Sequence, residues 1–189
     1  MVTLPLNEQK KYMGLADISF NQHFAVETSV GNFVIELKVK QAPITCAYFI
    51  QLLSSGTLTN GTLFRVLTDK NQQAAPRINV VQLGSDKKLD ELRTTIEHES
   101  TSISGLSHKK WCVSLARFNP GEAYQSFFVC MRDEPALNLG GTRHPDGQGF
   151  ACFGEVVKGY EVVEKLYKIA GHQEMLEPAI TIDSYHLVN

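Results

Sequence analysis

Arg65 is the residue whose type and setting best suit it for chemistry. It stands in an apolar run between Phe64 and Val66. A guanidinium stays charged at all working pH values and presents several N–H donors in a rigid fork. Aimed into a water-poor hollow, such a group can bind a carbonyl oxygen and stabilise charge as it develops there. Without further context, a strand arginine that points to solvent is the commoner explanation.

Gln82 is a second polar residue in an apolar setting, because it lies within the run Ile78 to Leu83. An amide that faces the interior must find hydrogen-bond partners, whereas on an edge strand it can turn outward to water. Both explanations stay open from the sequence. Phe128 lies in an apolar run and fits an ordinary core position, which is compatible with a further role.

Other kinds of catalytic chemistry have little support in this sequence. There is no G-x-S-x-G nucleophile motif, which disfavours a hydrolase, and no C-x-x-C or H-x-x-x-H spacing that predicts a metal site. The four cysteines are flanked by apolar or small residues. We therefore expect four buried free thiols rather than a disulfide framework or a zinc site, at positions Cys46, Cys112, Cys130 and Cys152.

Short strands that alternate or run apolar dominate the elements expected to position these residues. Eight are predicted, at 24–28, 33–39, 63–67, 78–83, 111–116, 127–131, 150–157 and 179–188. Two helices are predicted, one opened by Pro43 and ending near Gly56, the other from Tyr160 to Ile169. So many short strands favour a closed barrel or a sandwich, because closure removes exposed edges.

The 189 residues, 43% of them hydrophobic, are enough for one domain. We predict an N-terminal arm of uncertain structure at 1–22 and a single folded domain at 23–189. The connections 68–77 and 84–110 are long for a compact domain, which suggests that they serve function.

Seven motifs, in order along the chain, resemble those of cyclophilin-type peptidyl-prolyl cis-trans isomerases. Each is weak alone, but their order and spacing across about residues 24 to 188 are specific. The matching runs are 28–37, Ala42-Pro43-Ile44-Thr45, Thr62-Leu63-Phe64-Arg65-Val66, Val80-Val81-Gln82-Leu83-Gly84, 113–117, Gln125-Ser126-Phe127-Phe128-Val129 and 153–159.

The resemblance implies a mainly β fold, a closed eight-stranded antiparallel barrel capped by two α-helices. It also implies an enzyme that rotates X-Pro peptide bonds and so assists protein folding. Rotation of an amide meets a barrier of about 18–20 kcal/mol because of resonance, and the catalyst must favour the twisted amide over both planar forms. No cofactor or metal is needed, since no bond is made or broken.

The resemblance also assigns roles to single residues. Arg65, Gln82 and Phe128 match the catalytic positions, with Gln82 as the partner of Arg65 and Phe128 as the floor of the proline pocket. The implied substrate-binding residues are Phe64, Val80, Ala116, Arg117, Ser126, Leu137 and Phe150.

Two departures from the family pattern bear on activity. Asn79 stands where many members carry a pocket phenylalanine, and Ser126 stands where glutamine is usual. They favour an alternative function, a proline-peptide-binding or chaperone module on the same fold with weak or lost turnover. An unrelated ligand-binding barrel such as a lipocalin fits the strand count but leaves the ordered motifs unexplained.

The composition of the chain limits which partners and which cellular compartment we expect. The formal net charge is −2, and no basic stripe or apolar run of about 18 residues is present, so nucleic acid and membrane are disfavoured. We expect proline-containing peptides and unfolded proteins as partners, and a monomer. Expected free thiols and the lack of an apolar signal segment favour the cytoplasm, or the periplasm if a signal has been removed.

Overall fold

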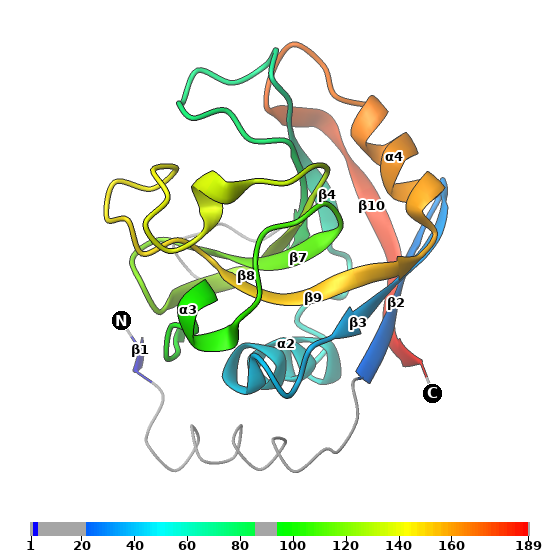
Figure 1. Ribbon diagram of the computed structural model, residues 1–189. Helices are drawn as coiled ribbons and strands as arrows, with labels where there is room; N and C mark the ends of the chain where they lie inside the picture. The colour runs from blue at the N-terminus through cyan, green and yellow to red at the C-terminus, as the bar shows by residue number, and fades with distance from the viewer. Residues whose placement is uncertain (1, 4–21, 86–93, 189) are drawn as a thin grey trace.

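The chain folds into a closed β-barrel, seen in a computed structural model that describes residues 2–3, 22–85 and 94–188 (Figure 1). Eight antiparallel strands form it in the order β8-β5-β4-β10-β2-β3-β9-β7, and pairing of β7 with β8 closes the ring. Their bounds are β2 (Gln22–Thr28), β3 (Gly31–Leu37), β4 (Thr62–Leu67), β5 (Val80–Gly84), β7 (Cys112–Arg117), β8 (Glu122–Cys130), β9 (Ala151–Lys158) and β10 (Met175–Val188). The predicted barrel is confirmed.

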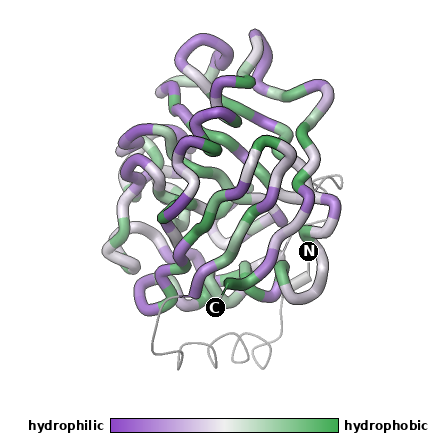
Figure 2. The backbone as a smooth tube through the Cα atoms, turned by 90° about the vertical axis from the view of Figure 1, so that its right-hand side faces the viewer, coloured by the Kyte–Doolittle hydropathy of each residue, from purple (hydrophilic) through white to green (hydrophobic). Residues whose placement is uncertain are grey.

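The two faces of the strands belong to different apolar clusters. On β5, for example, Val81 and Leu83 pack into the large cluster that fills the barrel, whereas Val80 joins a smaller cluster on the other face. This division follows from the period of two in a strand. Figure 2 shows hydrophobic residues along the strands and mostly hydrophilic residues in the connections.

Helix α2 (Pro43–Ser54) lies below the barrel in Figure 1 and sends Phe49 into the main core. The Phe49 ring lies 4.9 to 5.1 Å from three other phenylalanine rings, those of Phe24, Phe127 and Phe153. The start of the helix is held by the buried Glu99 carboxylate, which accepts hydrogen bonds from the backbone N–H groups of Ile44 (3.1 Å) and Thr45 (2.7 Å). A carboxylate is favoured there because the first N–H groups of a helix have no partner within the helix.

Helix α4 (Tyr160–Lys168) is amphipathic and buries Val162, Val163 and Leu166 against the barrel. Two further short helices were not predicted. The single turn α3 (Thr101–Ser104) and the 3-10 turn η3 (Pro135–Leu137) lie in connections that the sequence marks only as loops. Neither is long enough to show a periodic apolar pattern, which is why pattern analysis misses them.

The expectation of four free thiols is wrong for two of the cysteines. Cys112 on β7 and Cys152 on β9 form a disulfide, with Cα atoms 6.6 Å apart, whereas Cys46 and Cys130 are free and buried. The paired residues are 40 positions apart in the sequence. They meet only because β7 and β9 are neighbours in the barrel, and spacing alone does not reveal that.

Most of the predicted arm at 1–22 lies outside the described residues. Val2–Thr3 forms a short strand β1 that pairs in parallel with β6 (Thr94–Thr95), and β6 in turn pairs with β8. Gln22 already belongs to β2. The domain boundary therefore stays a prediction, with strand structure beginning one residue before it.

Gly159, at the entry to α4, should resist substitution. Its φ is +76°, and a Cβ there would stand 2.4 Å from the Asn32 carbonyl oxygen and 2.7 Å from the Phe33 Cα. We predict that Gly159→Ala lowers the free energy of unfolding by roughly 1–3 kcal/mol, through backbone strain and overpacking, as measured by urea denaturation. Gly171→Ala is the matched control, because a Cβ at Gly171 meets nothing within 4 Å. Equal stability of the two variants would contradict the prediction.

Candidate active site

A pocket of about 120 Å³ opens on the outer face of β4, β5, β7 and β8, beside the segment that follows η3. It combines an apolar floor with a polar wall that carries three arginines. The lining residues are Arg65, Leu67, Ile78, Val80, Gln82, Ala116, Arg117, Tyr124, Phe128, Leu137, Arg143 and Phe150. Such a mixture of apolar surface and a few converging polar groups is typical of a binding site.

Arg65 projects from β4 into this pocket and is held on one side by Glu174. Its Nε and Nη2 donate to the same carboxylate oxygen of Glu174, at 3.1 and 2.5 Å, and both side chains are about 30% exposed. The backbone N–H of Val66 donates to the Glu174 carbonyl at 2.9 Å, which fixes the position of Glu174. Arg65 Nη1 lies on the other side, 3.4 Å from Gln82 Oε1.

Gln82 is the polar centre of the wall and has partners at both ends of its amide. Its Oε1 accepts from Arg65, and its Nε2 donates to Tyr124 Oη and Ser126 Oγ, both at 3.0 Å. Ser126 Oγ then donates to the Leu83 carbonyl oxygen at 3.0 Å. Gln82 is only 4% exposed. Its hydrogen bonds therefore fix the amide group in a single orientation. Gln82 is therefore buried and hydrogen-bonded rather than turned outward to water, although its side chain lies on the outer face of the barrel.

The floor of the pocket is a stack of rings. Phe128 lies nearly parallel to the buried His108 ring, with centroids 6.3 Å apart, and meets Phe150 edge-on at 5.7 Å. His108 Nδ1 donates to Asn138 Oδ1 at 2.8 Å, so Nε2 accepts from Ser114 Oγ at 2.9 Å. Burial lowers the pKa of His108 to about 4, which keeps the ring neutral under Phe128 near neutral pH.

Arg117 closes one side of the pocket through a nearly buried ion pair. Its guanidinium makes two bonds of 2.9 Å to the two oxygens of Asp146, donates from Nε to the Gly149 carbonyl at 2.7 Å, and lies 4.8 Å from the Phe150 ring centre. The hydrogen bonds from Arg117 lower the pKa of Asp146 to about 2. The pair thereby ties the loop 138–149 to β7.

The chain matches the family model of cyclophilin type peptidyl-prolyl cis-trans isomerases over residues 23–187. This chain belongs to the cyclophilin family. Among curated relatives, a peptidyl-prolyl cis-trans isomerase of Streptomyces antibioticus is 30% identical, over 84% of this chain and 94% of that protein. One of Acinetobacter baylyi is 28% identical, over 79% and 73%. The protein is thus a peptidyl-prolyl cis-trans isomerase of the cyclophilin type.

A solved structure of similar fold is the cyclophilin-type isomerase of Cryptosporidium parvum. It superposes with a TM-score of 0.70 at 18% identity, covering 90% of this chain and 99% of that one. A second structure of the same protein, determined in the presence of the dipeptide Ala-Pro, gives 0.69 at 18% identity, covering 89% and 99%. At this identity the likeness supports the fold of the barrel.

Eight of the ten residues predicted from the sequence line the pocket of this cyclophilin. They are Arg65, Val80, Gln82, Ala116, Arg117, Phe128, Leu137 and Phe150. The other two do not line it. Phe64 is half-buried on β4, and Ser126 is 2% exposed behind Gln82. Their predicted contacts with substrate have no direct support in this geometry, although Ser126 still fixes the Gln82 amide.

Asn79, which stands where many family members carry a pocket phenylalanine, turns away from the pocket. Its Nδ2 donates to Asp69 Oδ1 at 3.1 Å, and its Oδ1 accepts from the Tyr167 hydroxyl on α4. Ile78 lines the pocket in its place. Asn79, the residue before β5, is therefore linked to α4 and does not line the pocket.

Sequence reasoning missed the apolar lining residues Leu67 and Ile78 and three polar residues of the site. Tyr124 shares a strand face with Ser126 and Phe128, and it would have been found had the predicted strand begun before Phe127, since β8 starts at Glu122. Arg143 lies in an irregular loop and donates to the carbonyl oxygens of Ala74 (3.2 Å) and Pro76 (2.9 Å). Neither it nor Glu174 carries a sequence pattern that could have marked it.

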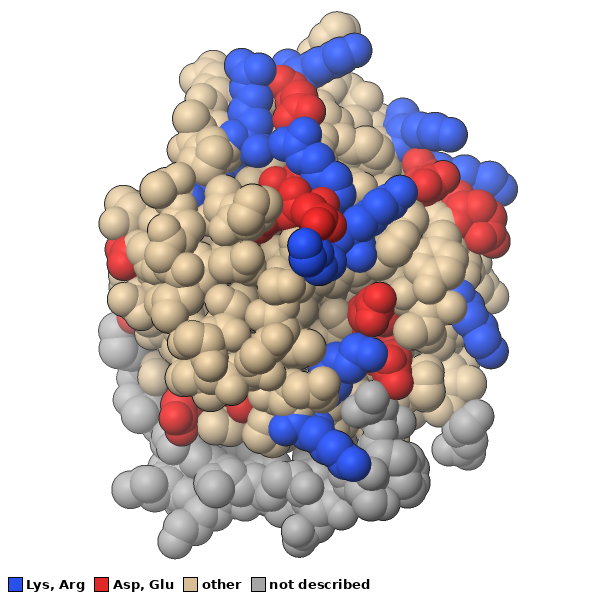
Figure 3. All heavy atoms as spheres, in the orientation of Figure 1, with Lys and Arg blue, Asp and Glu red and all other residues tan. Residues whose placement is uncertain are grey.

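Charged groups on the face of the molecule seen in Figure 3 are interleaved rather than separated by sign. Figure 3 shows lysine and arginine alternating with aspartate and glutamate over the upper part of this face. In the part of the chain that the structure describes, no three His, Cys, Asp or Glu side chains gather to hold a metal ion. The helices described there are also too short or too polar to cross a membrane.

The Arg117–Asp146 pair predicts a specific response to acid. A carboxylate whose folded pKa is about 2, against an ordinary 3.8, adds stability above the ordinary value and loses it as the pH falls toward 2. We expect Asp146→Asn to have a shallower loss of unfolding free energy than the wild type between about pH 5 and pH 2.5, from urea titrations. Asp183→Asn on β10 serves as the control. Parallel profiles for wild type and Asp146→Asn would contradict the assignment.

Proposed function

We propose that Arg65 and the hollow over Phe128 together carry the isomerisation of X-Pro bonds in this protein. The observation that supports this is that both residues line one pocket, the guanidinium on its wall and the ring on its floor. The proline ring enters the apolar part, formed by Val80, Phe128 and Leu137. The prolyl carbonyl then faces Arg65.

The physical requirement is a group that binds better when amide resonance is lost. A planar prolyl amide delocalises the nitrogen lone pair, and the barrier to rotation of about 18–20 kcal/mol measures that delocalisation. As the bond twists, the nitrogen regains its lone pair and becomes a better hydrogen-bond acceptor. A fixed guanidinium N–H beside it stabilises the twisted state more than either planar state, which is the condition for catalysis.

Gln82 serves as a positioning residue in this scheme. It touches Arg65 Nη1 but is itself held by Tyr124 and Ser126. A donor that is already oriented needs little reorganisation when the substrate rotates. Ser126, although it departs from the family pattern, therefore supports the mechanism from behind Gln82.

Glu174 opposes the mechanism to a small degree. It occupies two of the N–H donors of Arg65 and neutralises part of its charge. Because both side chains are partly exposed, the pair is worth about 0.2–1 kcal/mol. Substrate binding that draws Arg65 toward the prolyl amide must weaken this pair.

We infer that the physiological partners are proline-containing segments of unfolded proteins and that the chain acts as a monomer. The pocket is small and open to solvent, which suits an exposed loop or an extended chain better than a buried turn.

For the compartment, the periplasmic alternative gains support from the Cys112–Cys152 disulfide, since disulfides persist in oxidising surroundings. The cytoplasmic expectation loses the free-thiol argument at these two positions.

A second candidate function, peptide binding with low turnover, is favoured by one specific observation. Two of the Arg65 N–H donors are bonded to Glu174, which leaves fewer of them for a substrate. Isomerase activity of the wild type, compared with variants at position 65, separates the two candidates.

The first prediction for the proposed mechanism concerns Arg65. Loss of a charge-assisted bond worth about 1.5–3 kcal/mol should lower kcat/KM by roughly ten- to a hundred-fold in Arg65→Ala, measured by cis-to-trans conversion of an X-Pro peptide. Arg65→Lys should restore only part of the activity, because an ammonium lacks the planar fork. The control is Arg77→Ala, an exposed arginine in the neighbouring loop that lies outside the pocket lining. Equal turnover in wild type and Arg65→Ala would support the binding module instead.

The second prediction concerns Glu174. Removal of its charge in Glu174→Gln should release Arg65 and raise kcat/KM by roughly 1.5- to 5-fold, the value of a partly exposed ion pair. The double variant Arg65→Ala/Glu174→Gln should show no such gain over Arg65→Ala, because the effect acts through Arg65. A loss of activity in Glu174→Gln would mean instead that the carboxylate is needed to orient the guanidinium.

A further inference from the structure

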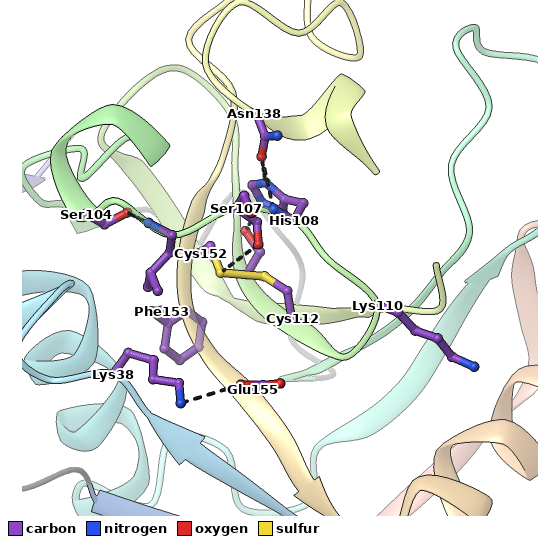
Figure 4. Close-up of a disulfide and its surroundings, with 12 residues drawn as sticks. Lys38, Ser104, Ser107, His108, Lys110, Cys112, Asn138, Cys152, Phe153 and Glu155 are labelled. Atoms are coloured by element: carbon purple, nitrogen blue, oxygen red, sulfur yellow. Dashed lines mark hydrogen bonds and ion pairs between the residues drawn. A yellow bond between two sulfur atoms is a disulfide. The ribbon is translucent and has the colours of Figure 1, made fainter. Parts of the chain in front are cut away.

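The Cys112–Cys152 disulfide stands at the side of a second cavity, which plays no part in the proposed isomerisation. This groove has a volume of about 240 Å³ against about 120 Å³ for the active-site pocket. Both cysteines line it, together with Ser107, Lys109 and Glu155. Figure 4 shows the bridge with Ser107 and His108 on one side and Glu155 on the other.

The disulfide borders this groove and has little exposed surface. Cys112 and Cys152 are 4% and 3% exposed, so a small molecule that enters the groove can approach them more easily than the folded surface of another protein. The ammonium groups of two lysines at the groove form ion pairs with carboxylates. Lys109 Nζ lies 2.8 Å from Asp133 Oδ2, and Lys110 Nζ lies 3.4 Å from Glu164 Oε1. The groove therefore selects by size rather than by charge.

A continuous set of contacts joins the disulfide to the active-site pocket. Both cysteines pack in the same apolar cluster as Phe128 and Leu137. Cys152 Sγ lies 3.9 Å from the Ser107 carbonyl oxygen, and the next residue is His108, whose ring stacks on Phe128. The bridge thus lies directly behind the floor of the proline pocket.

His108 extends this connection to the loop on the far side of the floor. Its backbone N–H and its Nδ1 both donate to Asn138 Oδ1, at 3.0 and 2.8 Å, and Asn138 follows the pocket residue Leu137. Its Nε2 accepts from Ser114, which is paired across the strands with Phe128 on one side and Cys152 on the other. Movement of the β7–β9 bridge would therefore shift the residues that grip the proline ring.

We propose that the Cys112–Cys152 disulfide is a modification site for small thiols, and that its reduction weakens binding at the proline pocket. This goes beyond the isomerase function and uses residues outside the catalytic set. Reduction removes the covalent tie between β7 and β9, and the apolar floor loses the constraint that holds Phe128 and Leu137 against the substrate. Oxidation restores that constraint.

The exchange balances as two thiol–disulfide steps. The thiolate of one small thiol attacks a bridge sulfur, the S–S bond breaks, a mixed disulfide forms, and the other cysteine leaves as a thiolate that takes up a proton. A second thiol molecule attacks the mixed disulfide, which frees the remaining cysteine and releases the oxidised small thiol. Two electrons pass from two thiol molecules to the bridge, and an oxidised small thiol reverses the reaction.

The site itself is tested without reference to isomerase activity. The oxidised protein is incubated with reduced glutathione under native conditions, and the free thiols and mixed disulfides are located by alkylation and mass spectrometry. We expect a glutathione adduct and then free thiols at Cys112 and Cys152. No reaction at these residues while the chain stays folded would overturn the proposal. Faster reduction by a thioredoxin-type protein dithiol than by glutathione at equal reducing power would overturn the preference for small thiols.

The role of the groove is tested by filling it. Ser107 is exposed at the groove, and Ser107→Phe should slow the reaction with glutathione by roughly fivefold or more, because access limits the exchange. Ser54→Phe, at an exposed position on α2, is the matched control and should react like the wild type. Equal rates in all three proteins would show that the groove is not the route.

The coupling to the pocket is tested with the isomerase assay. Reduction should raise KM by roughly three- to tenfold with a smaller change in kcat, because the substrate is gripped less firmly while Arg65 stays in place. The double variant Cys112→Ser/Cys152→Ser should behave like the reduced wild type and should not respond to glutathione. If oxidised and reduced protein have the same KM, the coupling is refuted. If neither form is active, the proposed function fails, while the glutathione result still decides whether the site exists.

Discussion

The active site depends on one constraint, the closure of the barrel between β7 and β8. That pairing completes a row of residues that oppose one another across neighbouring strands. Arg65 pairs with Gln82, Gln82 with Phe128, Phe128 with Ser114, and Ser114 with Cys152. Directly opposed residues share a face of the sheet, so the row lies on the outside of the barrel. The cation, the amide and the ring become neighbours because the strands that carry them are in register.

The interior of the barrel makes this outer row rigid. Phe127, next to Phe128 in the chain, points the opposite way and packs against Phe24 and Phe49. The same strand thus supplies a core anchor and a pocket floor at adjacent positions. An apolar outer face on a barrel strand would ordinarily be exposed surface, but here η3 and the loop 138–149 cover part of it. What remains open is the pocket.

Much of this arrangement could be predicted from the sequence. Alternation and turn residues predicted the eight strands and both longer helices, and the resemblance to the cyclophilin family implied that Arg65, Gln82 and Phe128 belong to one site. The ends of the strands were predicted less accurately. Tyr124 was not recognised as a site residue, because the predicted strand began at Phe127 whereas β8 begins at Glu122. Alternation fixes which side a residue takes but is weak at locating the first residue of a strand that starts with polar side chains.

The remaining features depend on contacts that no local pattern encodes. Glu174 reaches Arg65 because the chain returns from α4 to begin β10 beside β4, where Met175 is opposite Arg65. Cys112 and Cys152 meet for the same reason, since β7 and β9 become neighbours only in the closed barrel. Asn79 looked like a pocket residue by analogy, yet its partners Asp69 and Tyr167 draw it toward α4. In each case tertiary neighbours, rather than residue type, decide the role.

Strand β8 contributes Phe127 to the core and Phe128 to the pocket, and this limits where residues can be inserted or deleted. A residue inserted between Glu122 and Phe127 would reverse the orientation of every side chain beyond it in the strand, placing Phe127 outside and Phe128 within. Pairing with β5 and with β7 would fail together, because β8 belongs to both. Variation in length is therefore better tolerated in connections that do not line the pocket, while β8 must keep its residue count for the barrel and the pocket to form together.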